Sequence, residues 1–156
     1  MKSFILITVA FTLLIAACEK TPIKPVQFAR EPQTPDEQAV AQMLEAYVKA
    51  WNEHKAGNEQ DIDKFLSFYA PEAKIDSLVA GKVVSRAENK AAILAMHDPN
   101  YSKIALRKVS IKLLPPDRGQ VESEMLIFGP TKTRYPFIVD LIHRGGQWLI
   151  LEQKQH

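Results

Sequence analysis

Three residues whose side chains could act as acids, bases or hydrogen-bonding groups stand within apolar sequence patterns. Asp140 interrupts an apolar strand pattern between Ile138 and Ile142, so its carboxylate faces solvent, pairs with a cation, or lies in a pocket with a raised pKa. His143 shares a strand face with apolar neighbours and is either a general base or a histidine at the sheet edge. Tyr47 lies in the apolar stripe of a predicted helix, where its hydroxyl either finds one acceptor in the core or serves a pocket.

The composition argues against sites for metals and nucleic acids. The four histidines are scattered at positions 54, 97, 143 and 156, whereas a zinc site usually shows two ligands a few residues apart. We therefore expect no metal and no cofactor. The formal net charge of +2 over 156 residues produces no strong field, so nucleic acid is not an expected partner.

The first eighteen residues resemble a bacterial lipoprotein signal. Lys2 supplies a positive charge, residues 4–17 form an apolar run, and the run ends in small residues before Cys18, the one cysteine of the sequence. Fourteen apolar residues are too few for a membrane span, which needs about 20. In the lipoproteins that this segment resembles, a peptidase cuts before the cysteine, whose thiol carries lipid. An ordinary signal peptide cut after Ala17, which leaves a free thiol, is the alternative.

The resemblance also predicts where the protein resides. Lipoproteins that stay in the inner membrane usually have Asp after the cysteine, and this chain has Glu19. We therefore expect a protein anchored by acyl chains, palmitate among them, in the inner leaflet of the outer membrane and facing the periplasm. Several acyl chains on Cys18 make a durable anchor, because each buried CH2 contributes about 0.8 kcal/mol.

The rest of the chain has the size of one domain, since 139 residues follow the predicted cleavage site. Residues 19–35 contain four prolines and few apolar residues, which predicts an extended tether that does not pack and spans up to about 50 Å. The predicted organisation is a signal peptide over residues 1–17, the lipidated cysteine and tether over residues 18–35, and a folded domain over residues 36–156.

Three amphipathic segments in the first half of the domain predict helices. The first begins at a capping box over residues 34–37 and ends by Gly57. The second carries apolar residues at helical spacing over residues 62–69, and the third begins at a capping box over residues 85–88 and continues to His97. The second and third helices are separated by a short predicted hairpin.

From Ser102 onward the apolar period changes from 3.6 to 2, which predicts a long antiparallel sheet. The alternation slips near Arg107 and Lys108, as a β-bulge would produce. Gly145 and Gly146 are typical of a type I′ hairpin turn. The expected strands cover residues 74–79, 82–84, 102–114, 120–128, 135–144 and 147–154.

This order of elements resembles the nuclear transport factor 2-like family, in which a curved sheet wraps around helices to form a cone. Residues 68–76 (FYAPEAKID) are similar to the family's junction of tyrosine, acidic turn, alanine and strand, and residues 85–88 (SRAE) stand where the family often has Gly-Arg. The ending of residues 144–148 (RGGQW) is similar to the family's final hairpin. The resemblance implies an α+β fold, with three N-terminal helices packed on a cone-shaped, curved antiparallel sheet.

The family contains ketosteroid isomerases and dehydratases beside proteins that only bind or assemble, so the fold does not settle the function. In the isomerases, a tyrosine on the first helix and a protonated aspartate on a late strand form an oxyanion hole. The resemblance implies these roles for Tyr47 and Asp140. It places Ser77 at the position of the catalytic base, and serine cannot take a proton near neutral pH without a partner. Asp76 is adjacent, but neighbouring strand residues face opposite ways.

Three functions remain open. The first is a lipid-anchored protein whose domain binds a small apolar or amphipathic ligand, or a protein partner, without turning it over; Asp140 is then buried and donates a hydrogen bond. The second is an isomerase or dehydratase that uses Tyr47 and Asp140, with His143 or Asp76 as the base. The third is a dimeric assembly module of an envelope complex, because the last predicted strand carries apolar residues on both faces.

Overall fold

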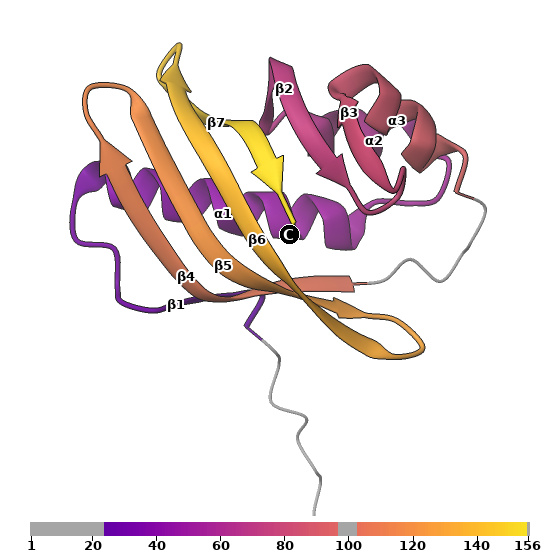
Figure 1. The fold of residues 1–156 in the computed structure, drawn as a ribbon, viewed down its shortest axis with the longest axis horizontal. Coiled ribbons are helices and arrows are strands. Elements are labelled where there is room, and N and C mark those ends of the chain that lie inside the picture. The colour runs from indigo at the N-terminus through magenta and orange to yellow at the C-terminus, as the bar shows by residue number, and fades with distance from the viewer. Residues whose placement is uncertain (1–23, 97–102, 156) are drawn as a thin grey trace, which may run out of the picture.

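The computed structural model describes residues 24–96 and 103–155 (Figure 1). The predicted signal segment, Cys18 and His97 lie outside the described residues. The elements, in chain order, are β1 (Val26–Phe28), α1 (Pro35–Glu53), α2 (Glu59–Leu66), β2 (Tyr69–Ser77), β3 (Lys82–Ser85), α3 (Arg86–Leu94), β4 (Lys103–Leu114), β5 (Arg118–Phe128), β6 (Lys132–Arg144) and β7 (Gln147–Lys154). No helix among these described residues is long and apolar enough to cross a membrane.

All seven strands of the described chain belong to one sheet, in the order β1-β4-β5-β6-β7-β2-β3. The long strands β4 to β7 pair antiparallel and bend around α1, which covers one face, while α2 and α3 lie beside the β2 and β3 end (Figure 1). We call the face toward α1 the inner face and the opposite face the outer face. The predicted α+β architecture, with three helices on a curved sheet, is confirmed. Two pairings, β1 with β4 and β2 with β7, are parallel.

Both capping boxes form as predicted. The Thr34 side chain accepts from the backbone N–H of Glu37 at 3.2 Å, and Ser85 and Glu88 repeat the arrangement at the start of α3. The prediction that the second helix reaches Tyr69 is wrong, because α2 ends at Leu66 and Tyr69 opens β2. Pro71 then lies inside that strand. The register of β2 against β7 shifts between Tyr69 and Lys74, and proline, which has no N–H to donate, is tolerated at such an irregularity.

The predicted irregularities of the sheet are confirmed. Between Arg107 and Ser110 the register of β4 against β5 shifts, and Lys108 has a φ of 54°. Gly145 and Gly146 have φ values of 61° and 79°, as a type I′ turn requires. The bulge bends the sheet, and the glycine turn closes its last hairpin.

Part of the segment that was predicted to be an unpacked tether is packed on the sheet. Val26–Phe28 forms β1 on the edge of β4, and the backbone N–H of Leu106 donates to Pro25 at 2.8 Å. Val26 is buried, because it extends the inner face by one strand. The prediction of an unpacked segment up to residue 35 is therefore wrong for its described part. The open hydrogen-bonding groups of the β4 edge accept the segment in spite of its proline content.

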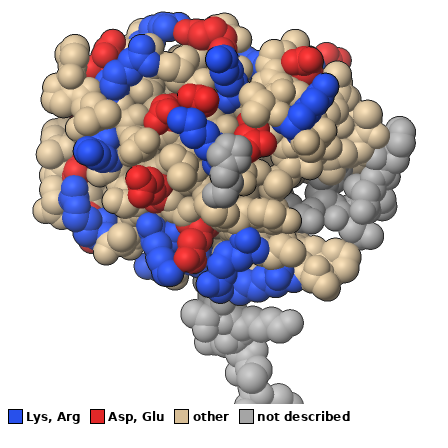
Figure 2. Space-filling model, in the orientation of Figure 1, with Lys and Arg blue, Asp and Glu red and all other residues tan. Residues whose placement is uncertain are grey.

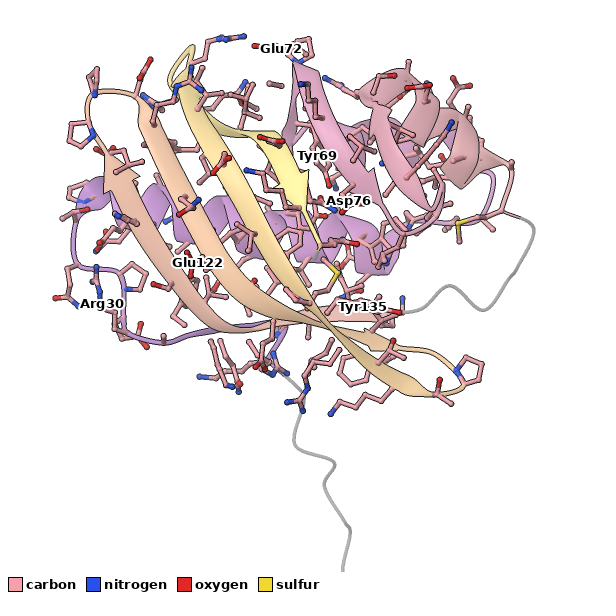
Figure 3. The ribbon with its side chains drawn as sticks, in the orientation of Figure 1. Arg30, Tyr69, Glu72, Asp76, Glu122 and Tyr135 are labelled. Carbon is pink, nitrogen blue, oxygen red and sulfur yellow. The ribbon has the colours of Figure 1, made fainter. Side chains whose placement is uncertain are left out.

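Arg30 fixes the chain between β1 and α1. Its guanidinium donates to the Glu37 carboxylate at 2.5 Å and lies next to the N-terminal end of α1 (Figure 3). This hydrogen bond and the backbone N–H of Gln33 lower the pKa of Glu37 to about 2. The capping box and the N-terminal segment thus share one carboxylate.

Candidate functional site

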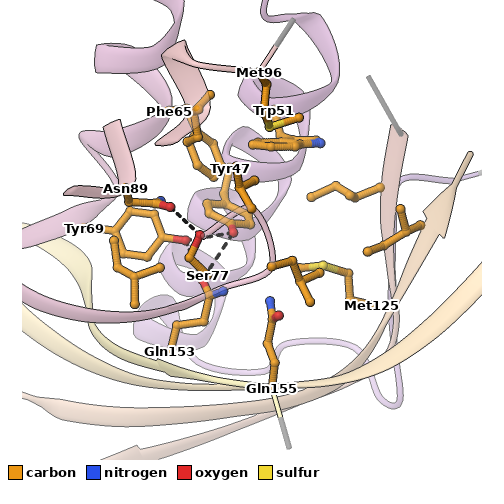
Figure 4. A pocket seen from close by; sticks show the side chains of 16 residues that line it. Tyr47, Trp51, Phe65, Tyr69, Ser77, Asn89, Met96, Met125, Gln153 and Gln155 are labelled. Atoms are coloured by element: carbon orange, nitrogen blue, oxygen red, sulfur yellow. Dashed lines mark hydrogen bonds between the residues drawn. The ribbon is translucent and has the colours of Figure 1, made fainter. Parts of the chain in front are cut away.

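A cavity of about 370 Å³ lies between the inner face of the sheet and the three helices (Figure 4). Its volume is within the range of roughly 300–1,000 Å³ that is usual for small-molecule sites. Aromatic and aliphatic side chains from α1, α2, α3, β4 and β5 form most of its wall. These are chiefly Trp51, Phe65, Ile93, Ile104, Met125 and Ile127.

One group of polar side chains in the wall joins three elements that are distant in the sequence. Tyr47 of α1 and Tyr69 of β2 have their hydroxyl oxygens 2.9 Å apart, and Tyr69 donates to Oε1 of Gln153 on β7 at 2.5 Å. The Gln153 amide nitrogen donates to the backbone carbonyl of Asp76 at 3.2 Å. The apolar stripe of α1, the first residue of β2 and the inner face of β7 therefore meet at this polar end.

A second pair of polar residues lies in the wall nearby. The Ser77 hydroxyl donates to Oδ1 of Asn89 at 2.6 Å and accepts from the backbone N–H of Ala80 at 3.1 Å. Both Ser77 and Asn89 are buried. The amide oxygen of Asn89 is too weak a base to remove the Ser77 proton, so this contact does not turn Ser77 into a catalytic base.

Burial raises the pKa of both tyrosines above the ordinary value of 10. For Tyr69, the charge and hydroxyl of the neighbouring Tyr47 act in the same direction. The ring of Phe65 packs on both, with centroid distances of 5.0 Å and 5.9 Å. The two phenols are therefore neutral hydrogen-bonding groups across the physiological pH range.

Asp140 does not line the cavity, and the prediction of a buried, donating carboxyl is wrong. Its strand neighbours Val139 and Leu141 are fully buried on the inner face, so alternation turns Asp140 to the outer face. There its carboxylate accepts from Gln120 and pairs with Lys154, each at 3.0 Å, and 34% of its side chain is exposed. Of the alternatives weighed from the sequence, pairing with a nearby cation is the one that the structure has.

The other two candidate bases also lie outside the cavity wall. The ring of His143 packs against Trp148 at a centroid distance of 5.0 Å. The Asp76 carboxylate accepts from the backbone N–H of Gln155 at 3.2 Å, and the Asp76 backbone carbonyl accepts from Gln153 of the polar group. Figure 3 shows Tyr69 and Asp76 on the same strand, β2. Of the five predicted pocket residues, the structure therefore brings Tyr47 and Ser77 together and leaves Asp140, Asp76 and His143 elsewhere.

Sequence reasoning missed Tyr69, Asn89, Gln153 and Gln155 as wall residues. Asn89 had a usable signal, because it lies one helical turn before Ile93 on the buried face of α3. Gln153 had none. It faces inward with Ile150, three residues earlier, because a register shift in the pairing of β6 with β7 takes up one residue.

The wall of the cavity is electrically neutral in the part of the chain that the structure describes. No Asp, Glu, Lys, Arg or His side chain of residues 24–96 and 103–155 lines it. The same residues contain no group of three or more acidic, histidine or cysteine side chains that could hold a metal ion. Hydroxyls, amides and aromatic surface are thus what the described wall offers a ligand.

Comparison with known proteins identifies the fold and shows no closer relationship than that. No family model matches the sequence, and no curated protein matches it. Among solved structures, a nuclear transport factor 2-like protein of unknown function from Shewanella oneidensis has a TM-score of 0.64 at 18% identity, over 77% of this chain and 98% of that one. A similar protein of unknown function from Pseudomonas putida has a TM-score of 0.62 at 13% identity, over 80% and 88%.

An enzyme-like name also occurs among these structures. A Novosphingobium aromaticivorans protein, provisionally named a scytalone dehydratase, has a TM-score of 0.60 at 11% identity over 78% of this chain and 83% of that one. At such identities the likeness shows the fold alone. The chain therefore has a nuclear transport factor 2-like fold, and this fold includes proteins named as enzymes as well as proteins of unknown function.

Proposed function

We propose that the domain binds a small apolar or amphipathic molecule in the cavity and does not transform it. The observation that carries the proposal is the wall itself, which combines extended aromatic and aliphatic surface with one small group of neutral polar side chains. Such a combination buries a mostly apolar ligand and orients it through few polar contacts.

The chemistry of the wall supports binding over acid–base catalysis. A general base works best with a pKa near the operating pH. The described wall offers two tyrosines with raised pKa values and a serine whose hydroxyl is bonded to an amide oxygen rather than to a base. Asp140 and His143, which the isomerase hypothesis needs, contribute nothing to the wall. The fold is then the one observation that still supports the dehydratase hypothesis.

A dimeric assembly role has weaker support. The outer face, which a second copy would cover, carries interspersed positive and negative side chains (Figure 2). Leu149 is buried and Leu151 half-buried within the single chain, so the apolar residues that suggested an interface are largely covered already. Sedimentation of the purified domain at two concentrations tests this role, and a stable dimer would restore it.

Binding is tested first with the protein purified from its own host. We expect a native mass spectrum to show a retained small molecule, and the neutral fluorophore N-phenyl-1-naphthylamine to bind and brighten. Met125→Trp fills the cavity from β5 and should abolish both signals. Leu114→Trp places the same side chain at an exposed site on β4 and serves as the matched control. A wild-type protein that retains nothing and binds no apolar probe would refute the proposal.

We further propose that Cys18 is lipidated and holds the domain at the inner leaflet of the outer membrane, facing the periplasm. The support is the sequence of residues 1–19. Cys18→Ala should move the protein to the soluble periplasmic fraction or leave it unprocessed, and Glu19→Asp should shift it toward the inner membrane. A processed Cys18→Ala protein that stays in the membrane fraction would contradict lipid anchoring.

A further inference from the structure

We propose that the cavity selects a neutral ligand that carries a hydrogen-bond donor, such as a hydroxyl or an amide N–H, at the end where Tyr47 lies. The inference rests on the proposed binding function and specifies the chemistry of its ligand. It follows from the direction of the hydrogen bonds in the polar group, which the distances determine.

The orientation of the Gln153 amide is fixed from outside the cavity. One end of the amide lies 3.2 Å from the backbone carbonyl oxygen of Asp76. A carbonyl oxygen only accepts, so the nitrogen must be at that end. The other end, Oε1, is then an acceptor that faces the two tyrosines.

The position of the Tyr69 proton follows. Its hydroxyl oxygen lies 2.5 Å from Gln153 Oε1, a distance at which two oxygens need a proton between them. The Tyr47 oxygen is 3.5 Å from the same Oε1, at the limit of a hydrogen bond. Tyr69 therefore donates to Gln153, and its oxygen is left as an acceptor.

The Tyr47 hydroxyl donates its proton to the Tyr69 oxygen. The two hydroxyl oxygens lie 2.9 Å apart, and because Tyr69 has already donated its proton, Tyr47 must be the donor of this pair. The remaining capacity of the Tyr47 oxygen is its lone pairs. A ligand atom that reaches this oxygen must then donate a hydrogen bond. An oxyanion hole has the opposite polarity, because its hydroxyls donate to the reacting oxygen.

Gln155 supplies a second acceptor in the same wall. Its Oε1 is buried and has no hydrogen-bond partner among the described residues. Figure 4 shows the Gln155 side chain standing beside Gln153 and directed toward the cavity. Buried acceptors are normally paired, so this oxygen favours a donor on the ligand.

The described wall carries no charged side chain, and this favours an uncharged ligand. A carboxylate or ammonium group in the cavity would leave water without meeting an opposite charge from residues 24–96 or 103–155. Burying such an unpaired charge is far more costly than burying a hydroxyl. The preferred ligand is therefore uncharged.

Three naphthalenes of nearly equal size separate these properties. 2-Naphthol donates a hydrogen bond, 2-methoxynaphthalene only accepts, and 2-naphthoate carries a negative charge at neutral pH. In titration calorimetry with the full mature chain, we expect 2-naphthol to bind about tenfold tighter than the methoxy compound, the worth of one net hydrogen bond. We expect the heat of mixing with 2-naphthoate to show no saturation.

Tyr47→Phe removes the proposed acceptor and leaves the ring. It should bring the affinities for 2-naphthol and 2-methoxynaphthalene to within about twofold of each other. Tyr135→Phe makes the same change at a β6 tyrosine that does not line the cavity and should keep the wild-type ratio. Thermal unfolding of both variants shows whether they are folded. Should Tyr47→Phe not fold, Gln155→Leu replaces it, with the exposed Gln38→Leu as its control.

The outcomes separate the inference from the function on which it rests. If none of the three compounds binds, the proposed function and the inference both fail. If 2-methoxynaphthalene binds as tightly as 2-naphthol, or 2-naphthoate binds best, the cavity binds ligands but the inference is overturned. If the ratio survives Tyr47→Phe, donor selection through Tyr47 is overturned.

Discussion

The two faces of the sheet hold polar residues of different kinds. On the inner face, the hydroxyls and amides around Tyr47 and Gln153 are buried, neutral and directed toward one cavity. On the outer face, Asp140 pairs with Lys154, and Glu124 contacts Lys108 at 2.8 Å, all at least partly exposed. The inner face can orient a ligand, whereas the outer face keeps the sheet soluble.

The comparison shows how little separates the two kinds of site in the sequence. Asp140 lies between Val139 and Leu141, and a shift of one residue would have put its carboxylate on the inner face. A carboxylate within an apolar strand is therefore ambiguous until the parity of the strand is known. Each exposed pair on the outer face contributes only about 0–1 kcal/mol to stability.

The largest expected contrast lies between two adjacent residues of β6. Leu141→Ala should lower the free energy of unfolding by about 2–5 kcal/mol, because it leaves a void in the inner face. Asp140→Ala should lower it by less than about 1 kcal/mol, because it removes partly exposed pairs. Urea unfolding of both variants measures the difference. Equal losses would mean that the two faces are not energetically distinct.

The edge strand tests how far the inner face extends. A chain beginning at Gln33 lacks β1, and with it the buried Val26 and the backbone pairing of β1 with β4. Its thermal midpoint should be lower by more than about 5 °C, on the order of 1 kcal/mol for this size, than that of a chain beginning at Glu19. The same midpoint for both chains would show that β1 adds nothing to the core.

The faces should also lose stability at opposite ends of the pH scale. The unfolded chain loses tyrosine protons near pH 10, while burial raises the pKa of Tyr47 and Tyr69 in the fold, so stability is complete below about pH 10 and falls as the pH rises above it. The hydrogen bond from Lys108 lowers the pKa of Glu124 from 4.5, so its contribution is present above that pH and is lost in acid.

Unfolding free energies across the pH range check both limbs. Tyr47→Phe should reduce the loss of stability at alkaline pH, while Tyr69 retains part of it, and should leave the loss in acid unchanged. Glu124→Gln should reduce the loss in acid, while Glu37 retains part of it, and should leave the alkaline loss unchanged. An alkaline limb that Tyr47→Phe does not alter would show that this tyrosine ionises as readily in the fold as in the unfolded chain.

The smallest expected effect concerns Asp140 and the ligand. Asp140→Asn should change the affinity for 2-naphthol by less than about twofold, since the side chain lies on the outer face, against about tenfold for Tyr47→Phe. Calorimetry under identical conditions compares the two. A tenfold effect of Asp140→Asn would return this carboxylate to the binding site.

The features predicted correctly from the sequence are local ones. Both capping boxes, the turn at Gly145 and the bulge at Lys108 depend on residues close together in the chain, and the structure confirms each. The strand β1 and the role of Tyr69 were not predictable in this way. Val26 pairs with Leu106, and Tyr69 opens a strand rather than ending a helix, so both depend on partners about 80 residues away.

The candidate site follows the same division. The helical stripe predicted a buried Tyr47, and the resemblance to a family predicted both Tyr47 and Ser77 for the site. Gln153 was not predicted, because strict alternation along β7 would place it on the outer face. A register shift between β6 and β7 turns it to the inner face. Asp140 was misplaced because its position was matched to a family residue without that parity being fixed.

The pairing of β1 with β4 also sets a distance. If Cys18 carries the proposed lipid, only residues 19–25 separate the bilayer from the first strand, and seven residues span at most about 25 Å. That reach is half of the roughly 50 Å expected of a free segment up to residue 35. An apolar molecule that leaves the leaflet would then meet the cavity at the high effective concentration that a short connection imposes, without any affinity of the domain for the membrane surface.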